Sequence, residues 1–292
     1  MTVVPVLSLS GAPGVTTLAC LIASTWPDQG PVMVAECDPS GGDLAARFGL
    51  MSTVGWRSLA AAVRRTGPTT PLHPHLQGLP GGLPVLIGAE EGTPLAADAP
   101  EALVVRDAPG GGRGDGVVVV DLGRASRDLT DTGGWLEAGD LSILVVRDDA
   151  AAALRVRDRA AELLDRTDGR LGLVVVGGSS FRCRELAEFT GIAALGDVAF
   201  DPENAAVASG ASGASRRLEH SRLLASVRRV GERVAIQTRE GALPEHQVDV
   251  SDHRVLDDRA TRPKIDRTSV RSFLSPRWAA GRRSSASLDG AV

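Results

Sequence analysis

Short apolar runs alternate with helix-like stretches along most of this chain. The runs that predict strands, rich in Val, Leu and Ile, are 4–9, 32–36, 83–87, 117–121, 141–146, 171–176 and 194–198. The stretches between and after them predict helices over 17–25, 44–48, 56–65, 99–106, 150–166, 184–190 and 221–235. Continuous apolar strands separated by helices are typical of a parallel sheet covered on both faces. The pattern therefore predicts an α/β fold, a three-layer α/β/α sandwich around a mostly parallel, twisted sheet.

The alternation ends near residue 236. Residues 237–292 are rich in Arg, Asp, Ser and Pro and contain only scattered apolar positions, so they bury too little surface to order themselves. We expect a folded domain over 1–236 and a disordered tail over 237–292. A small cluster around Phe273 and Trp278, set among arginines, is a candidate contact for a partner or a membrane surface, but the composition favours a solvated tail.

Charge and cysteine content narrow the class of protein. The formal net charge is −4, which gives no overall bias toward nucleic acid or anionic membranes. The three cysteines are far apart and show no CxxC spacing, which favours free thiols in a reducing compartment. No apolar run approaches the ~20 residues of a membrane span, and the N-terminus lacks the charged start of a signal peptide. We expect a cytoplasmic protein.

The first strand leads into a glycine-rich turn, Ser10-Gly-Ala-Pro-Gly-Val-Thr-Thr17, and then into a helix. Such a turn directs backbone N–H groups toward a phosphate, as in a P-loop. The candidate nucleotide-binding residues are Gly11, Ala12, Pro13, Gly14, Val15, Thr16 and Thr17. In the general motif a lysine precedes the threonine whose hydroxyl holds Mg²⁺. Thr16 is present for the metal, but Val15 occupies the lysine position.

Acidic residues follow the second strand. Glu36, Asp38 and Asp43 are expected at the carboxyl edge of the sheet, where open α/β folds bind ligands. Carboxylates there hold Mg²⁺ or orient the attacking water in phosphoryl transfer. Asp38 is the candidate catalytic residue, and Asp38 and Asp43 are further candidates for the metal. The alternative for Asp43 is that it caps the helix that begins at Leu44.

The strand over 117–121 ends in Asp121, followed by Leu122 and Gly123. An aspartate at this point is the usual anchor behind a bound Mg²⁺, and the N–H of Gly123 is a candidate donor to a terminal phosphate.

In this order, the motifs resemble those of the MinD/ParA family of P-loop ATPases with a deviant Walker A motif. The counterparts are Ser10–Thr17, Glu36–Ser40, Asp121–Gly123 and the segment Leu195–Pro202. The resemblance is to an actinobacterial-type branch of chromosome-partitioning or pilus-assembly ATPases. It implies ATP or ADP with Mg²⁺ as ligands, Asp38 as the water-orienting carboxylate, and a nucleotide-dependent homodimer. It also implies a protein partner in a positioning or secretion system, and peripheral contact with nucleoid or membrane.

Two lysines of that family are missing here. Its signature lysine corresponds to Ser10 and its general P-loop lysine to Val15, and the only lysine in the chain is Lys264. Weak hydrolysis is therefore expected. Arg124 and Arg147 are candidates to replace the lost charge, the alternative being surface ion pairs. The family's adenine-reading Asn would fall near 177–178, where the sequence has glycine.

Three functions remain open from the sequence. The first is an ATP-dependent positioning switch, and the second is a pseudo-ATPase scaffold that keeps the fold and barely hydrolyses ATP. The third is an NAD-dependent oxidoreductase, with Gly11 and Gly14 at a pyrophosphate and Glu36 at a ribose hydroxyl. Non-specific DNA binding is a further hypothesis, tied to the arginines at 216, 217, 228, 229 and 233.

Overall fold

A computed structural model describes residues 1–11, 13–28, 30–67, 70–88, 116–130, 132–177, 182–211 and 218–240, all of which fall in one compact unit, Met1–Glu245. The helix predicted over 99–106 and most of the tail predicted over 237–292 lie outside the described residues; the first four residues of that tail, 237–240, are helical, so the folded part extends beyond the predicted boundary at 236.

An eight-stranded sheet forms the centre of the described part of the chain. Its strand order is β3-β4-β2-β5-β1-β6-β7-β8, and each pair of neighbours is parallel except β3 with β4. The strands are β1 (Thr2–Ser8), β2 (Val32–Glu36), β3 (Gln77–Gly78), β4 (Pro84–Leu86), β5 (Val117–Arg124), β6 (Ser142–Arg147), β7 (Leu171–Val176) and β8 (Ala193–Val198). The mostly parallel sheet predicted from the apolar runs is confirmed.

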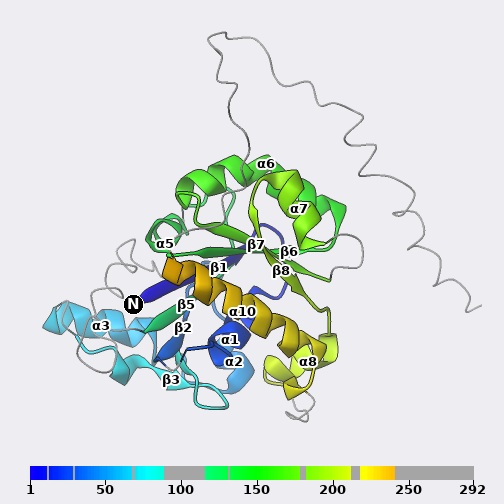
Figure 1. Ribbon diagram of the computed structural model, residues 1–292. Coiled ribbons are helices and arrows are strands. Elements are labelled where there is room, and N and C mark those ends of the chain that lie inside the picture. The colour runs from blue at the N-terminus through cyan, green and yellow to red at the C-terminus, as the bar shows by residue number, and fades with distance from the viewer. Residues whose placement is uncertain are drawn as a thin grey trace, which may run out of the picture. The chain divides into compact units, whose positions relative to one another are not determined.

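Helices cover both faces of this sheet, as the sequence predicts. Helices α6 and α7 lie over one face, and α1 and α10 over the other (Figure 1). The described helices are α1 (Val15–Ser24), α2 (Leu44–Phe48), α3 (Trp56–Thr66), the short 3₁₀ helix η1 (His73–His75), α5 (Gly133–Ala138), α6 (Ala150–Arg166), α7 (Cys183–Thr190), α8 (Pro202–Ala208) and α10 (Arg222–Glu240).

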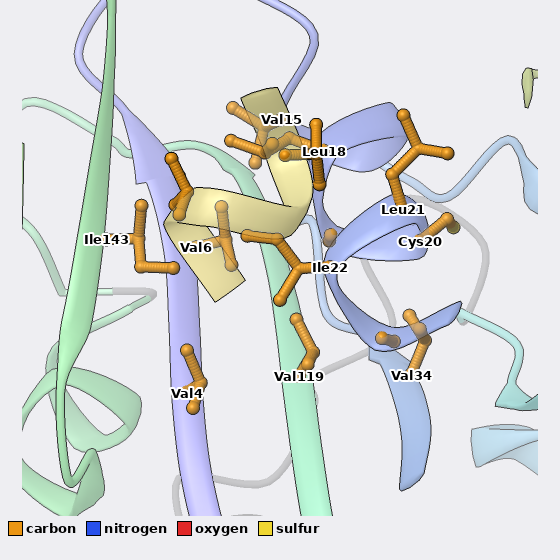
Figure 2. Close-up of a cluster of buried hydrophobic side chains, with 14 of the residues drawn as sticks. Val4, Val6, Val15, Leu18, Cys20, Leu21, Ile22, Val34, Val119 and Ile143 are labelled. Carbon is orange, nitrogen blue, oxygen red and sulfur yellow. The ribbon is translucent and has the colours of Figure 1, made fainter. Parts of the chain in front are cut away.

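Helix α1 is packed against the sheet by a continuous apolar side. Val15, Leu18 and Ile22 are buried in a cluster that includes Val6 on β1 and Ile143 on β6. Figure 2 shows these side chains gathered between α1 and the strands. Burial of a full Val, Leu or Ile side chain stabilises a fold by about 1.5–3 kcal/mol, so this side fixes where α1 begins relative to β1.

The strand order brings three chain segments to one edge. Strand β5 lies between β1 and β2, with Glu36 opposite Asp121 and Ser8 opposite Arg124 in the register. The turn after β1, the acidic residues at and after the end of β2, and Asp121 near the end of β5 therefore meet at the carboxyl edge of the sheet. In the dinucleotide-binding order the first and second strands are neighbours, whereas here β5 separates them. The topology thus argues against the oxidoreductase hypothesis.

Candidate functional site

The turn between β1 and α1 leaves the first amides of the helix open. Gly14 is the N-cap residue and has a left-handed backbone, with φ 86° and ψ 34°, which glycine adopts without strain. No side chain caps α1, and its first turn carries no acidic residue. The first N–H groups of a helix have no partner within the helix, and its N-terminus carries partial positive charge. This end of α1 is thus suited to an anion.

A hollow of about 270 Å³ opens at this turn, and we name it the acidic hollow. Its walls come from the turn, the loop after β2, helix α2 and the end of β5. The residues that line it are Ser8, Pro13, Gly14, Val15, Thr16, Thr17, Glu36, Asp38, Gly41, Gly42, Asp43, Arg47, Gly123 and Arg124. The structure thus brings most of the predicted site residues together. Gly11 is exposed and Asp121 is buried, and neither lines the hollow, while Ala12 lies outside the described residues.

Asp121 is buried behind Thr16. Its Oδ1 accepts a hydrogen bond from the N–H of Gly123 at 3.0 Å, whereas its Oδ2 is buried and has no hydrogen-bond partner among the described residues. Burial raises the pKa of Asp121 to about 7, although interactions with the Thr16 side chain and the Gly123 amide act in the opposite direction. A buried carboxylate oxygen without a partner, next to a threonine, fits an Mg²⁺ anchor.

Asp38 lies against the turn that follows Asp121. A Cβ atom placed on Gly123 would lie 1.8 Å from the Asp38 Oδ2, and Gly123 has a positive φ of 55°. The other oxygen, Oδ1, accepts the N–H of Ser40 at 2.8 Å. Partial burial raises the pKa of Asp38. The candidate catalytic carboxylate therefore faces the same hollow as Thr16 and Gly123.

Glu36 has a structural function in this arrangement. It is 1% exposed, and its two oxygens accept the N–H groups of Leu44 at 2.9 Å and Gly88 at 2.7 Å. Its backbone carbonyl accepts the indole N–H of Trp56 at 2.9 Å. Desolvation raises the pKa of Glu36. Both carboxylate oxygens are already used, so Glu36 holds the loop in place and is poorly suited to bind a ribose hydroxyl.

Asp43 precedes α2 at the N-cap position but makes no capping hydrogen bond with its side chain. Its Oδ2 instead forms an ion pair with Arg47. Among the described residues no group of three or more His, Cys, Asp or Glu side chains is arranged to hold a metal. A bound Mg²⁺ would thus depend on Thr16, Asp121 and oxygens of the ligand, as is usual for Mg²⁺ with phosphates.

The two positions that lack lysine have different surroundings. The Val15 side chain is 4% exposed and belongs to the apolar cluster under α1 (Figure 2). Ser10 accepts a hydrogen bond from Nη1 of Arg155 on α6, at 3.0 Å. Of the two predicted replacements, Arg124 lines the acidic hollow, whereas Arg147 pairs with Asp149 at 3.4 Å and does not line it.

A second hollow, of about 360 Å³, lies on the other side of the turn, and we name it the apolar hollow. It shares Pro13, Gly14 and Thr17 with the acidic hollow. Its remaining walls are mostly apolar: Leu18, Leu21, Val176, Val198, Ala199, Phe200, Asp201, Pro202, Ala205, Ala206, Ser209 and Leu223. The sequence did not predict this hollow, because the residues that form it come from α1, β7, β8, α8 and α10.

No family model matches this sequence, and no curated protein matches it. Solved structures do match. MinD from Aquifex aeolicus has a TM-score of 0.61 at 16% identity, over 80% of this chain and 97% of that one. A ParA family ATPase from Chlorobium tepidum TLS has a TM-score of 0.58 at 14% identity, over 79% and 97%. This chain has the fold of the MinD and ParA ATPases. A third similar structure, MinD from Pyrococcus horikoshii OT3, was solved with Mg-ADP and has a TM-score of 0.60 at 14% identity, over 82% and 98%.

The remaining residues considered in the sequence, chiefly the arginines proposed for DNA contact, lie in different surroundings. Arg228 and Arg229 are exposed on α10, whereas Arg233 donates a hydrogen bond to the carbonyl of Leu195 at 2.6 Å. The arginines at 216 and 217 lie outside the described residues. Within the described part of the chain, no helix is long and apolar enough to cross a membrane. The three cysteines are free and buried.

Proposed function

We propose that this chain is a MinD/ParA-type ATP-binding protein that acts as a nucleotide-dependent dimerising switch in subcellular positioning. The process is chromosome partitioning, cell division, or assembly of a pilus or secretion system. The observation that carries the proposal is the acidic hollow, where an uncapped helix start meets Thr16, together with the buried Asp121 nearby, whose Oδ2 has no hydrogen-bond partner among the described residues. An anion site beside a carboxylate is what a complex of Mg²⁺ and phosphate requires.

The two hollows together match the two ends of a nucleotide. The phosphates bind at the amides of the turn in the acidic hollow, and the base and ribose extend into the apolar hollow. Phe200, which is 75% exposed at the wall of the apolar hollow, offers an aromatic surface to a purine. The shared residues Pro13, Gly14 and Thr17 lie between the two ends of the ligand.

Several groups in and beside the acidic hollow have a proposed function. The amides of the turn and of Gly123 bind phosphate oxygens, while Thr16 and Asp121 hold Mg²⁺, which neutralises phosphate charge when bound. Asp38 orients the attacking water, because its carboxylate lies against Gly123. Hydrolysis is slow, since neither Val15 nor Ser10 supplies the charge of a lysine in the transition state.

We further propose that the protein acts in the cytoplasm, at the periphery of the nucleoid or membrane. A protein component of a positioning or secretion system is its main partner. Non-specific DNA contact involves the exposed Arg228 and Arg229 on α10, and the segment from residue 241 onward is the one for any membrane contact.

The test is nucleotide binding and dimerisation by the full chain. Calorimetric titration with MgATP and light scattering on a sizing column are expected to give saturable binding and a shift from monomer to dimer. Thr16→Ala is expected to weaken MgATP binding about tenfold or more, because a charge-assisted contact contributes about 1.5–3 kcal/mol. Thr25→Ala is the matched control, since Thr25 ends the same helix and its hydroxyl donates to the carbonyl of Leu21. Absence of saturable binding by the wild-type chain, or Thr16→Ala binding like wild type, would overturn the proposal.

The alternative is a pseudo-ATPase scaffold. Its support is the burial of Val15 in the core, which leaves the general lysine position without charge. Phosphate release measured with and without DNA separates the two functions. Turnover that Thr16→Ala abolishes supports the switch, and nucleotide-dependent dimerisation without turnover supports the scaffold.

A further inference from the structure

The acidic hollow needs positive charge, and the described residues contain no lysine to supply it. Glu36, Asp38 and Asp43 line it, so a phosphate ligand enters a hollow whose walls already carry carboxylates. The only lysine of the chain, Lys264, lies outside the described residues. The cationic side chains that line this hollow in the described part of the chain are Arg47 and Arg124.

Arg47 comes from α2, whose backbone is held at both ends. The helix begins at Leu44, whose N–H is bound by Glu36. At the other end, a Cβ atom on Gly210 would lie 2.6 Å from the carbonyl oxygen of Arg47, so the chain after α8 packs closely there. The guanidinium pairs with Asp43, and the side chain is 30% exposed. Arg47 lines the acidic hollow together with Val15, Thr16 and Thr17, so it lies beside the helix that begins at the turn.

Arg124 approaches the hollow from a different element. It is the last residue of β5 and lies opposite Ser8, the last residue of β1, in the parallel register. It follows Gly123, whose backbone is fixed by the hydrogen bond to Asp121. Its side chain is exposed and forms no ion pair with a described residue. The guanidinium therefore has no competing carboxylate partner to give up within the described part of the chain.

We propose that Arg47 and Arg124 bind the terminal phosphates of the nucleotide from two walls of the acidic hollow, in place of the missing lysines. This inference rests on the proposed function and names residues that deepen it. Arginine forms bidentate, charge-assisted hydrogen bonds with phosphate. When the ligand enters, the Arg47 guanidinium leaves Asp43 and binds the phosphate instead. The Arg124 guanidinium binds the phosphate without first leaving an ion pair with a described residue.

Calorimetric titration with MgATP and Mg-tripolyphosphate tests the pair in the full chain. Arg47→Ala and Arg124→Ala are each expected to weaken binding of both ligands about tenfold, and the double variant about a hundredfold. The controls are Arg184→Ala, which removes another i,i+4 ion pair on a helix, and Arg147→Ala, which removes another arginine at the end of a strand. Both controls are expected to bind like wild type, and thermal melting verifies that every variant is folded.

Asp43→Asn separates phosphate binding from a structural role of the ion pair. If Arg47 binds phosphate, this variant frees the guanidinium, and MgATP binds as tightly as to wild type or more tightly. If the pair only holds α2 in place, Asp43→Asn weakens binding as much as Arg47→Ala does, and the inference is wrong for Arg47.

The outcomes also separate this inference from the proposed function. Wild-type binding of MgATP with no loss in either arginine variant overturns the arginine pair and leaves the switch intact. Binding of Mg-tripolyphosphate but not of MgATP, with loss in the variants, overturns the switch and supports the arginine pair. If wild type binds neither ligand, both are overturned.

Discussion

The acidic and apolar hollows share one turn of the chain but differ in nearly every other wall residue. On one side of Gly14 lie carboxylates and guanidiniums, and on the other lie Leu, Val, Ala and Phe200. The difference follows from topology, because the end of β2 and the loop after it carry the acids that line the first hollow, while α1, β7, β8, α8 and α10 carry most of the apolar groups that line the second. A single glycine-rich turn thereby serves a ligand with a charged end and a flat, apolar end.

The two hollows also differ in how unfavourable the surroundings of their nearby carboxylates are. Asp121 is buried, and one of its oxygens has no hydrogen-bond partner among the described residues. Burial raises its pKa to about 7, because removal from water disfavours the ionised carboxylate. In the wall of the apolar hollow, Asp201 caps α8 by accepting the N–H of Asn204 at 3.1 Å. Groups held at a cost are characteristic of functional sites, which favours the acidic hollow as the chemical centre.

The largest predicted effect comes from closing the acidic hollow at Gly123. Gly123→Ala places a Cβ atom 1.8 Å from the Asp38 carboxylate, so Asp38 must move. We expect MgATP affinity to fall about a hundredfold and the free energy of unfolding to fall by about 1–2 kcal/mol, the cost of a non-glycine residue in the left-handed region. Calorimetry and denaturant unfolding measure the two effects.

Gly169→Ala is the matched control for this variant. Gly169 also has a positive φ, of 73°, but a Cβ atom there has open space around it. The control is expected to lose the same 1–2 kcal/mol, roughly, and to keep its affinity. Equal loss of affinity in both variants would mean that backbone strain, and not displacement of Asp38, is responsible.

A smaller effect is predicted in the apolar hollow. Phe200→Ala is expected to weaken binding of MgATP about tenfold or more, since stacking of a base on an aromatic side chain contributes about 1–3 kcal/mol. Because Phe200 is 75% exposed, the melting temperature is expected to change little. Mg-tripolyphosphate, which has no base, should bind this variant like wild type.

Ile236→Ala, another exposed apolar residue, is the control for Phe200. If Phe200→Ala weakens binding of MgATP and of Mg-tripolyphosphate equally, the assignment of the base to the apolar hollow and of the phosphates to the acidic hollow is contradicted.

The smallest predicted effect is a gain. Val15 lies at the boundary between the acidic hollow and the core, so Val15→Lys restores a charge from the general lysine position. We expect MgATP to bind about threefold more tightly, with a lower melting temperature because buried valine surface is lost. A variant that is destabilised and binds no better would show that the lysine cannot leave the core for the hollow.

Much of the fold could be predicted from the sequence. Strands β2 and β7 and helices α2 and α6 begin and end at the predicted residues, because unbroken apolar runs and strong amphipathic patterns fix them. Helices α5 and α8 were missed. Helix α5 begins with two glycines, which are poor helix formers, so the sequence there gives no helix signal. Helix α8 does carry such a signal, because Asp201 precedes it and Pro202 is its first residue.

Only those site residues that belong to a recognisable motif at the end of a strand could be predicted from the sequence. Thr16, Asp38 and Gly123 were predicted because each ends or follows a strand at the carboxyl edge. Arg47 was not predicted, since its position in the hollow depends on α2 folding back toward α1. The structural role of Glu36 was also hidden, because its partners at 44 and 88 are far apart in the sequence.

Glu36 has a consequence for the energetics of ligand entry. By holding the amides of Leu44 and Gly88 and the indole of Trp56, it ties down the loop that carries Asp38 before any ligand arrives. A segment that is ordered in advance loses little conformational entropy when a ligand binds, so less of the favourable free energy of each contact is offset and binding is tighter. The carboxylate that is least available for chemistry therefore governs how rigid the mouth of the cavity is.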